Sequence, residues 1–261
     1  GDAAEESEEG FTVLKGTIAN VCGNVISSAI SSITGLVSSL LELSEATVEI
    51  NTNQGKLQAA IADTGHSIEY MDEQYTNLYG YLNDDMAVTN CILNMEKLGL
   101  SQKDTTALTD SAIAVWTAYG DSIPLEGLAE SINETVLVGQ ITGTMADAVN
   151  WAKDTNINLG NALKGNKKAQ AAYNKAVKEG LPVEDAFNAA LGEISDKSER
   201  AKLITEVLNA TYGKSKDAYD KANQSLIEYN QSQGEYEKAQ AELGSAMMPV
   251  NTAITNLKAS F

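Results

Sequence analysis

Few residues of this 261-residue chain could ligate a metal or act as a nucleophile or base. His66 is its only histidine, and Cys22 and Cys91 are its only cysteines. A zinc site needs about four such ligands, and two thiols are too few for a disulfide framework. We therefore expect no metal centre and no cofactor. The cysteines suit small apolar positions, and His66 suits a surface or helix-capping position.

Two stretches resemble ligand-binding loops only in part. Gly160 and Gly165 stand five apart, but the Gly-Lys-Ser/Thr that ends a phosphate-binding loop does not follow them. Asp154, Asn156 and Asn158 begin like a calcium-binding EF-hand, whereas Gly165 occupies the twelfth position, where that loop needs glutamate. The sequence also has no serine elbow and no HExxH motif. We expect that the protein is not an enzyme.

The charge balance argues against polyanionic partners. Thirty-six acidic side chains outnumber eighteen basic ones, which gives a net charge of −18, and Arg200 is the single arginine. Nucleic acids and anionic membrane surfaces are bound by faces rich in lysine and arginine. We therefore expect no recognition of nucleic-acid sequence. Residues 1–10 are rich in acids and poor in large apolar residues, which predicts a disordered acidic tail.

The first element that could organise the chain is a long amphipathic helix, expected over residues 11–64. Residues 16–41 carry no charge, but half of them are Ser, Thr, Asn or Gly, which is too polar for a stable membrane span. Apolar residues recur at steps of three and four, in an eleven-residue repeat typical of a nearly straight helix bundle. We expect this stripe to pack within the protein or against another copy; conditional membrane insertion stays open. It consists of Ile18, Cys22, Val25, Ile26, Ile30, Ile33, Leu36, Val37 and Leu40.

The spacing of capping residues in residues 65–212 predicts a helical globular domain made of short, well-capped helices. Ser101 and Asp104 have the spacing of a capping box. Pro124 and Pro182 stand where a first helical turn begins. Trp116 and Trp151 are the expected centre of the core.

Residues 213–261 predict a heptad helix and the start of a further helix after Pro249. Two series of residues seven apart, offset by three, form an a/d pattern. Antiparallel pairing with the first helix would give a stalk. We therefore predict an all-α fold: a compact multi-helix domain flanked by two long helices that pair as an antiparallel coiled coil. The stalk or self-association residues expected here are Tyr219, Leu226, Tyr229, Tyr236 and Leu243.

Five segments, taken in order, carry a resemblance to a known family. They are GFTVLKGTIANVCGNVISSAISSITGLVSSLLELSEAT (10–47), LGLSQ (98–102), AVWTAYGDSIPLEGLAESINETVLVGQITGTMADAVNWA (114–152), SERAKLITEVLNATYG (198–213) and MMPVNTAITNLKASF (247–261). Together they resemble the tail tape measure proteins of long-tailed bacteriophages and of prophages in Gram-positive bacteria. The resemblance covers nearly the whole chain. At 261 residues the chain is short for such a protein, so we expect it to be a piece of a longer one.

The resemblance implies a structural protein of the virion that helps to set tail length and fills the tail tube before DNA ejection. It implies a homo-oligomer inside the tube, contacts with tail tube and tail tip proteins, and transient contact with a membrane. It places the protein in the phage tail, and in the bacterial cytoplasm during assembly. Some relatives carry a peptidoglycan hydrolase domain, but no segment here matches one. The alternative reading is a helical extracellular adhesin or effector domain that binds a host protein.

Overall fold

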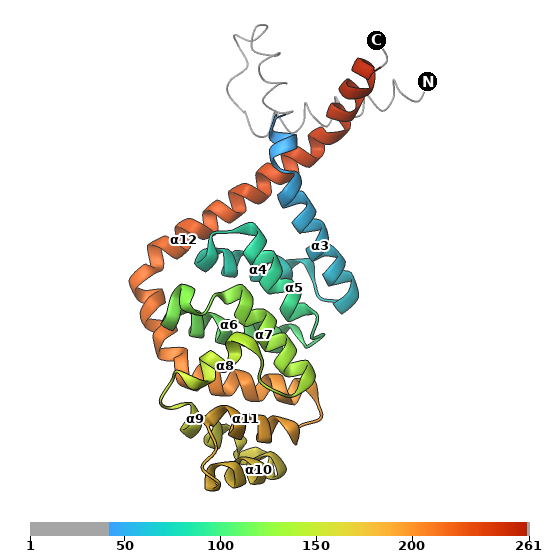
Figure 1. The fold of residues 1–261 in the computed structure, drawn as a ribbon. Helices are drawn as coiled ribbons and strands as arrows, with labels where there is room; N and C mark the ends of the chain where they lie inside the picture. The colour runs from blue at the N-terminus through green and yellow to red at the C-terminus, as the bar shows by residue number, and fades with distance from the viewer. Residues whose placement is uncertain (1–41, 260–261) are drawn as a thin grey trace. The chain divides into compact units, whose positions relative to one another are not determined.

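The computed structural model describes residues 42–259, and its regular structure is all helical in that range (Figure 1). This confirms the predicted all-α class. The described part of the chain divides into two compact units, one of residues 56–231 and one formed by residues 42–55 together with residues 232–259. The helices are α3 (Val48–Thr64), α4 (Ile68–Leu82), α5 (Asp85–Glu96), α6 (Gln102–Tyr119), α7 (Leu125–Val138), α8 (Gly143–Asn150), α9 (Thr155–Ala162), α10 (Lys167–Lys178), α11 (Val183–Gly192) and α12 (Lys197–Ala259).

Local sequence signals set many of these boundaries. The Ser101 hydroxyl accepts a hydrogen bond from the Asp104 backbone N–H at 3.2 Å and donates to the Asp104 carboxylate at 2.7 Å. Helices α7 and α11 each begin directly after a proline, at Pro124 and Pro182. The capping signals predicted at these three positions are therefore confirmed.

The core of the 56–231 unit is formed by side chains from the end of α3, from α4 to α11 and from the first part of α12. Trp116 packs against this core, as predicted. Trp151 does not: it is 48 % exposed, and its ring meets Tyr119 edge-on, with ring centroids 5.2 Å apart. The expectation that both tryptophans fill the core is wrong for Trp151, because this residue follows the last turn of α8 and lies at the surface. Fully buried members of the core include Tyr75, Leu78, Ile113, Leu128, Val149, Phe187, Ile204 and Leu208.

Helix α12 is longer than the sequence predicts. It starts at Lys197 instead of 213, passes through Gly213 without a break, and continues through Pro249. Gly213 stays helical because the preceding turns are fixed by buried side chains, among them Val207 and Leu208. That packing outweighs the cost of glycine in a helix, which is roughly 1 kcal/mol relative to alanine. The helix is interrupted at Asn223, whose φ of −116° and ψ of 16° are not helical.

None of the helices in the described range is both long enough and apolar enough to cross a bilayer.

Candidate functional site

The best candidate for a functional surface is the side of α12 that carries large side chains without burying them. Leu226, Tyr229 and Tyr236 are 50 %, 59 % and 58 % exposed. They follow one another at heptad spacing, with intervals of three and seven residues, and therefore share one face of the helix. Leu243, which continues the series, is partly buried. Three members of the series are therefore exposed on α12, and the prediction that the series packs in a stalk or in self-association stays a prediction.

The opposite side of α12 explains why those side chains face outward. In the 56–231 unit, the Asn230 side chain donates a 3.0 Å hydrogen bond to the backbone carbonyl of Gly80 in α4. A Cβ atom at Gly80 would lie 2.9 Å from Ile227 and 3.1 Å from Gln231. The two helices meet closely because glycine leaves room at the crossing for Ile227 and Gln231.

A second close approach involves the later part of α12, within the other unit. A Cβ atom on Gly244 would collide with the Thr47 hydroxyl and lie 3.2 Å from the Leu43 carbonyl. Ala241, Met247 and Thr47 are buried in the same unit. Small residues again permit the contact. It is a local crossing, and the coiled-coil pairing of two long helices stays a prediction.

Tyr219, the first member of the predicted series, lies in an aromatic and charged cluster with α4 and α6. Its ring centroid is 5.6 Å from that of Trp116 and 6.1 Å from that of Tyr81. Lys216 donates hydrogen bonds to Asp220 at 2.7 Å and to the Tyr81 hydroxyl at 3.0 Å, and Tyr81 donates to Asp220 at 2.8 Å. The cluster joins α12 to the core one turn before the break at Asn223.

The charges of this cluster support one another. Burial raises the pKa of Tyr81 to about 12, although the hydrogen bond from Lys216 lowers it. Burial by itself lowers the pKa of Lys216, but the hydrogen bonds to Asp220 and Tyr81 outweigh this and raise it above its ordinary value. Lys216 therefore stays charged and paired at neutral pH. Its ammonium is occupied in holding the helix.

The predicted stripe of the first helix lies outside the described residues. This applies to Ile18, Cys22, Val25, Ile26, Ile30, Ile33, Leu36, Val37 and Leu40, and to the predicted disordered tail 1–10.

His66 is the main polar residue whose position in the structure differs from the one predicted from the sequence. Its Nδ1 lies 2.7 Å from the Glu96 carboxylate, and its Nε2 lies 3.0 Å from the Leu100 carbonyl. Tyr70 donates a 3.3 Å hydrogen bond to the other Glu96 oxygen. The side chains of His66 and Glu96 are 9 % and 2 % exposed, so the predicted surface or capping role is wrong; Ser67 caps the helix instead. Glu96 lies thirty residues away in sequence, and no local pattern links the two.

This cluster has a defined proton requirement. A carbonyl oxygen only accepts, so the hydrogen between Nε2 and Leu100 belongs to the imidazole. The other ring nitrogen, Nδ1, faces the Glu96 carboxylate at 2.7 Å. Burial, followed by the Glu96 charge, raises the pKa of Tyr70 well above its usual range. Both ring nitrogens thus lie against protein oxygen atoms in a buried setting.

Arg200 also has a structural place. Its guanidinium donates hydrogen bonds of 3.0 Å to the carbonyls of Val136 and Leu137, at the C-terminal end of α7, and one of 2.6 Å to the Ile194 carbonyl. Gly139, with φ of +77°, turns the chain there, and a Cβ atom on it would lie 2.6 Å from the guanidinium carbon. A cation at this helix end is favourable for the helix dipole.

The chemical inventory of the described residues is small. Among them, no three His, Cys, Asp or Glu side chains come together as metal ligands. Cys91 is a buried free thiol, as its expected apolar role requires, and burial raises its pKa to about 12. No protein-family model, curated protein or solved structure matches the chain.

Proposed function

We propose that the chain is a structural part of a bacteriophage tail, with the role of a tape measure protein. The observation that carries the proposal is α12, a helix of 63 residues that presents Leu226, Tyr229 and Tyr236 to the outside at heptad spacing. A measuring protein needs length along one axis and a seam for neighbouring copies. An α-helix rises about 1.5 Å per residue, so residues 224–259 alone provide about 54 Å. The resemblance of the five sequence segments supports the same role.

In this role the exposed face of α12 packs against other copies inside the tail tube. The copies contact tail tube and tail tip proteins and leave ahead of the DNA, with transient membrane contact. The protein works without a cofactor, without an enzymatic activity and without reading nucleic-acid sequence. It resides in the virion and, during assembly, in the bacterial cytoplasm.

An in-frame deletion tests the proposal. Removing residues 225–252 from the protein in the phage takes out four heptads, including the exposed face itself, and joins Gln224 to Ala253 without a shift of heptad register. The tail should shorten by about 42 Å, the length of 28 helical residues, and duplicating the same segment should lengthen it by as much. Electron micrographs of virions measure both changes.

A substitution variant separates length from packing. Replacing Leu226, Tyr229 and Tyr236 with alanine preserves the helix length, so the tails that form should have normal length while their yield falls. Unchanged tail length after the deletion would contradict a measuring role. If infectivity or attachment to the host were then lost, the adhesin or effector alternative would be favoured instead.

A further inference from the structure

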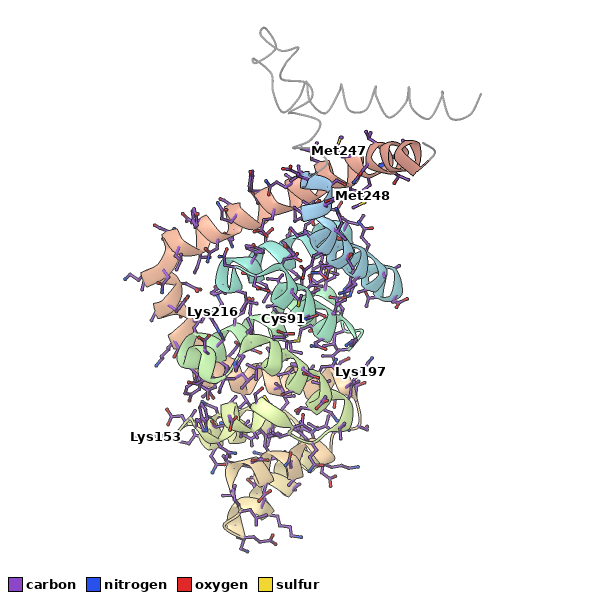
Figure 2. The ribbon with its side chains drawn as sticks, turned by 45° about the horizontal axis from the view of Figure 1, so that its top comes forward. Cys91, Lys153, Lys197, Lys216, Met247 and Met248 are labelled. Atoms are coloured by element: carbon purple, nitrogen blue, oxygen red, sulfur yellow. The ribbon has the colours of Figure 1, made fainter. Side chains whose placement is uncertain are left out.

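The charges of the 56–231 unit are strongly separated along the chain. Residues 57–152 hold fourteen acidic and two basic side chains, a net charge of −12. Residues 153–178 hold six lysines and one aspartate, a net charge of +5. The net charge of −18 conceals this basic segment. Within the unit, α9 and α10 lie at the end farthest from α4 (Figure 1), and Lys153 projects outward near that end (Figure 2).

The lysines gather on the outer face of α10. One side of this helix is buried through Ala169, Tyr173 and Ala176, where it packs mainly on α11. The other side exposes its lysines. Val177 and Leu181 are exposed at the C-terminal end of the helix, where Val177 lies next to Lys178 and on the side away from Lys168 and Lys175. Lys175 reaches Glu179 only at 4.0 Å, in a pair that is itself largely exposed. We call this surface the lysine face; it consists of Lys164, Lys167, Lys168, Lys175, Lys178, Val177 and Leu181.

A matching surface of opposite charge lies on α7. Glu126, Glu130 and Glu134 are spaced four residues apart and are all exposed, so they form one ridge along the helix. Exposed Leu137 and Val138 follow at its end. We call these five residues the glutamate ridge. Helix α7 packs mainly on α5 and α8, and α10 packs mainly on α11. Glu126 accepts a 2.7 Å hydrogen bond from Asn90 of α5 and Glu134 one of 3.1 Å from Thr142, while all three carboxylates stay exposed.

We propose that the lysine face of one copy docks on the glutamate ridge of a second copy. Each surface offers a row of charges and two aliphatic side chains, and the two rows have opposite signs. Contact would pair the charges and remove the aliphatic side chains from water. Because the two surfaces are unlike, the contact joins α10 of one copy to α7 of another.

The observations favour a second copy over a nucleic acid or a membrane. A chain of charge −18 is repelled by any extended polyanion. The aliphatic side chains of the lysine face would also stay in water against a phosphate backbone. Between two copies, the general repulsion is screened beyond about 8 Å at physiological salt, whereas adjacent lysine–glutamate pairs still attract.

Charge exchange with complementation tests the contact. One variant carries Lys168→Glu and Lys175→Glu, and a second carries Glu130→Lys and Glu134→Lys. Sedimentation velocity of the full chain should show salt-sensitive association, weakened about tenfold or more in each variant alone. An equimolar mixture of the two variants should recover it, because each then supplies the surface that the other lacks. Association through other surfaces should be the same in the unmodified chain, in each variant and in the mixture, so it does not affect the comparison between them.

The matched control is Lys202→Glu with Lys214→Glu, which makes the same charge change at exposed lysines of α12. It should associate like the unmodified chain, and circular dichroism should show the same helix content for every variant. Four results would each overturn the proposal: no association at physiological salt, equal weakening by the control, no recovery in the mixture, or loss of association when Glu5, Glu6, Glu8 and Glu9 become glutamine. Lysine-face binding to phosphatidylglycerol vesicles by a chain that stays monomeric would identify a lipid partner instead.

Discussion

Before Asn223, α12 buries large aliphatic side chains such as Ile204, Val207 and Leu208; after it, the buried side of the same helix carries Asn230 and Gly244. The first part is held by apolar area, whose removal from water provides the stabilising free energy. The later part buries fewer large side chains, with Ile227 packed on the core and Met247 buried, and it combines them with close backbone approach at Gly80 and Gly244. It leaves Leu226, Tyr229 and Tyr236 exposed. The part of α12 before the break at Asn223 is therefore an internal element, and the part after the break presents large side chains at the surface. The predictions below test this contrast.

The largest expected difference is between two leucines of this helix. Leu208→Ala removes a fully buried side chain and should lower the free energy of unfolding by about 2–5 kcal/mol. Leu226→Ala makes the same chemical change at a half-exposed position and should cost less than about 1 kcal/mol. Urea denaturation followed by circular dichroism measures both. Equal losses would show that the later part of α12 is packed as firmly as the first.

Two glycines of the helix should respond with opposite signs. Gly213 has open space around it, so Gly213→Ala should raise the free energy of unfolding by about 0.5–1 kcal/mol through helix preference. At Gly244 the added methyl group meets Thr47 and Leu43, and Gly244→Ala should lower stability by about 1–3 kcal/mol. Hydrogen exchange in residues 43–55 reports the second change locally. If hydrogen exchange in residues 43–55 became faster after Gly213→Ala but did not change after Gly244→Ala, the tight contact with this segment could not be at Gly244.

The sequence predicts correctly those helix boundaries that are set by residues close together in the chain. The cap at Ser101 and the helix starts after Pro124 and Pro182 depend on groups within four positions, and all three are confirmed. The continuity of α12 through Gly213 and Pro249 was missed, because local helix breakers were outweighed by contacts with distant segments.

The packed face of α12 was missed for a different reason. The helix carries two stripes at heptad spacing, one of large residues such as Tyr229 and Tyr236 and one of small residues such as Gly234 and Ala241. Judged by hydrophobicity, the stripe of large residues is predicted to be the buried one. In the structure the stripe of small residues is buried instead, because it allows the close helix crossings at Gly80 and Gly244. The His66–Glu96 pair was also beyond local reasoning, because it exists only once α4 and α5 pack together.

Asp110 of α6, which interacts with the charge of Lys216, should make the stability of the protein depend on pH. Burial raises the pKa of this carboxyl group, with the Lys216 charge and a hydrogen bond from Asn77 acting against it. The folded state therefore binds the proton more tightly than the unfolded state, and stability falls as pH rises from below the ordinary aspartate pKa through the raised folded value. Asp110→Asn should remove this decline and stabilise the protein at pH 7 by up to about 1 kcal/mol. Urea denaturation at several pH values between 3 and 7 measures it, and an unchanged slope in the variant would exclude Asp110 as the cause.

The smallest expected effect concerns the boundary between the two parts. The Asn223 side chain donates a 3.0 Å hydrogen bond to the Tyr219 carbonyl and so competes with the backbone for that acceptor. Asn223→Ala removes the competitor and introduces a better helix former, so residue 223 should become helical with a stability change of a few tenths of a kcal/mol. The Cα chemical shift of residue 223 measures its conformation, and Gln224→Ala at the exposed neighbouring position is the control. A shift that stays non-helical in Asn223→Ala would mean that the break is imposed by packing on either side, through Tyr219 against Trp116 and Ile227 against Gly80. The difference between the two parts of α12 would then originate in the helices that it contacts, and not in its own sequence at the boundary.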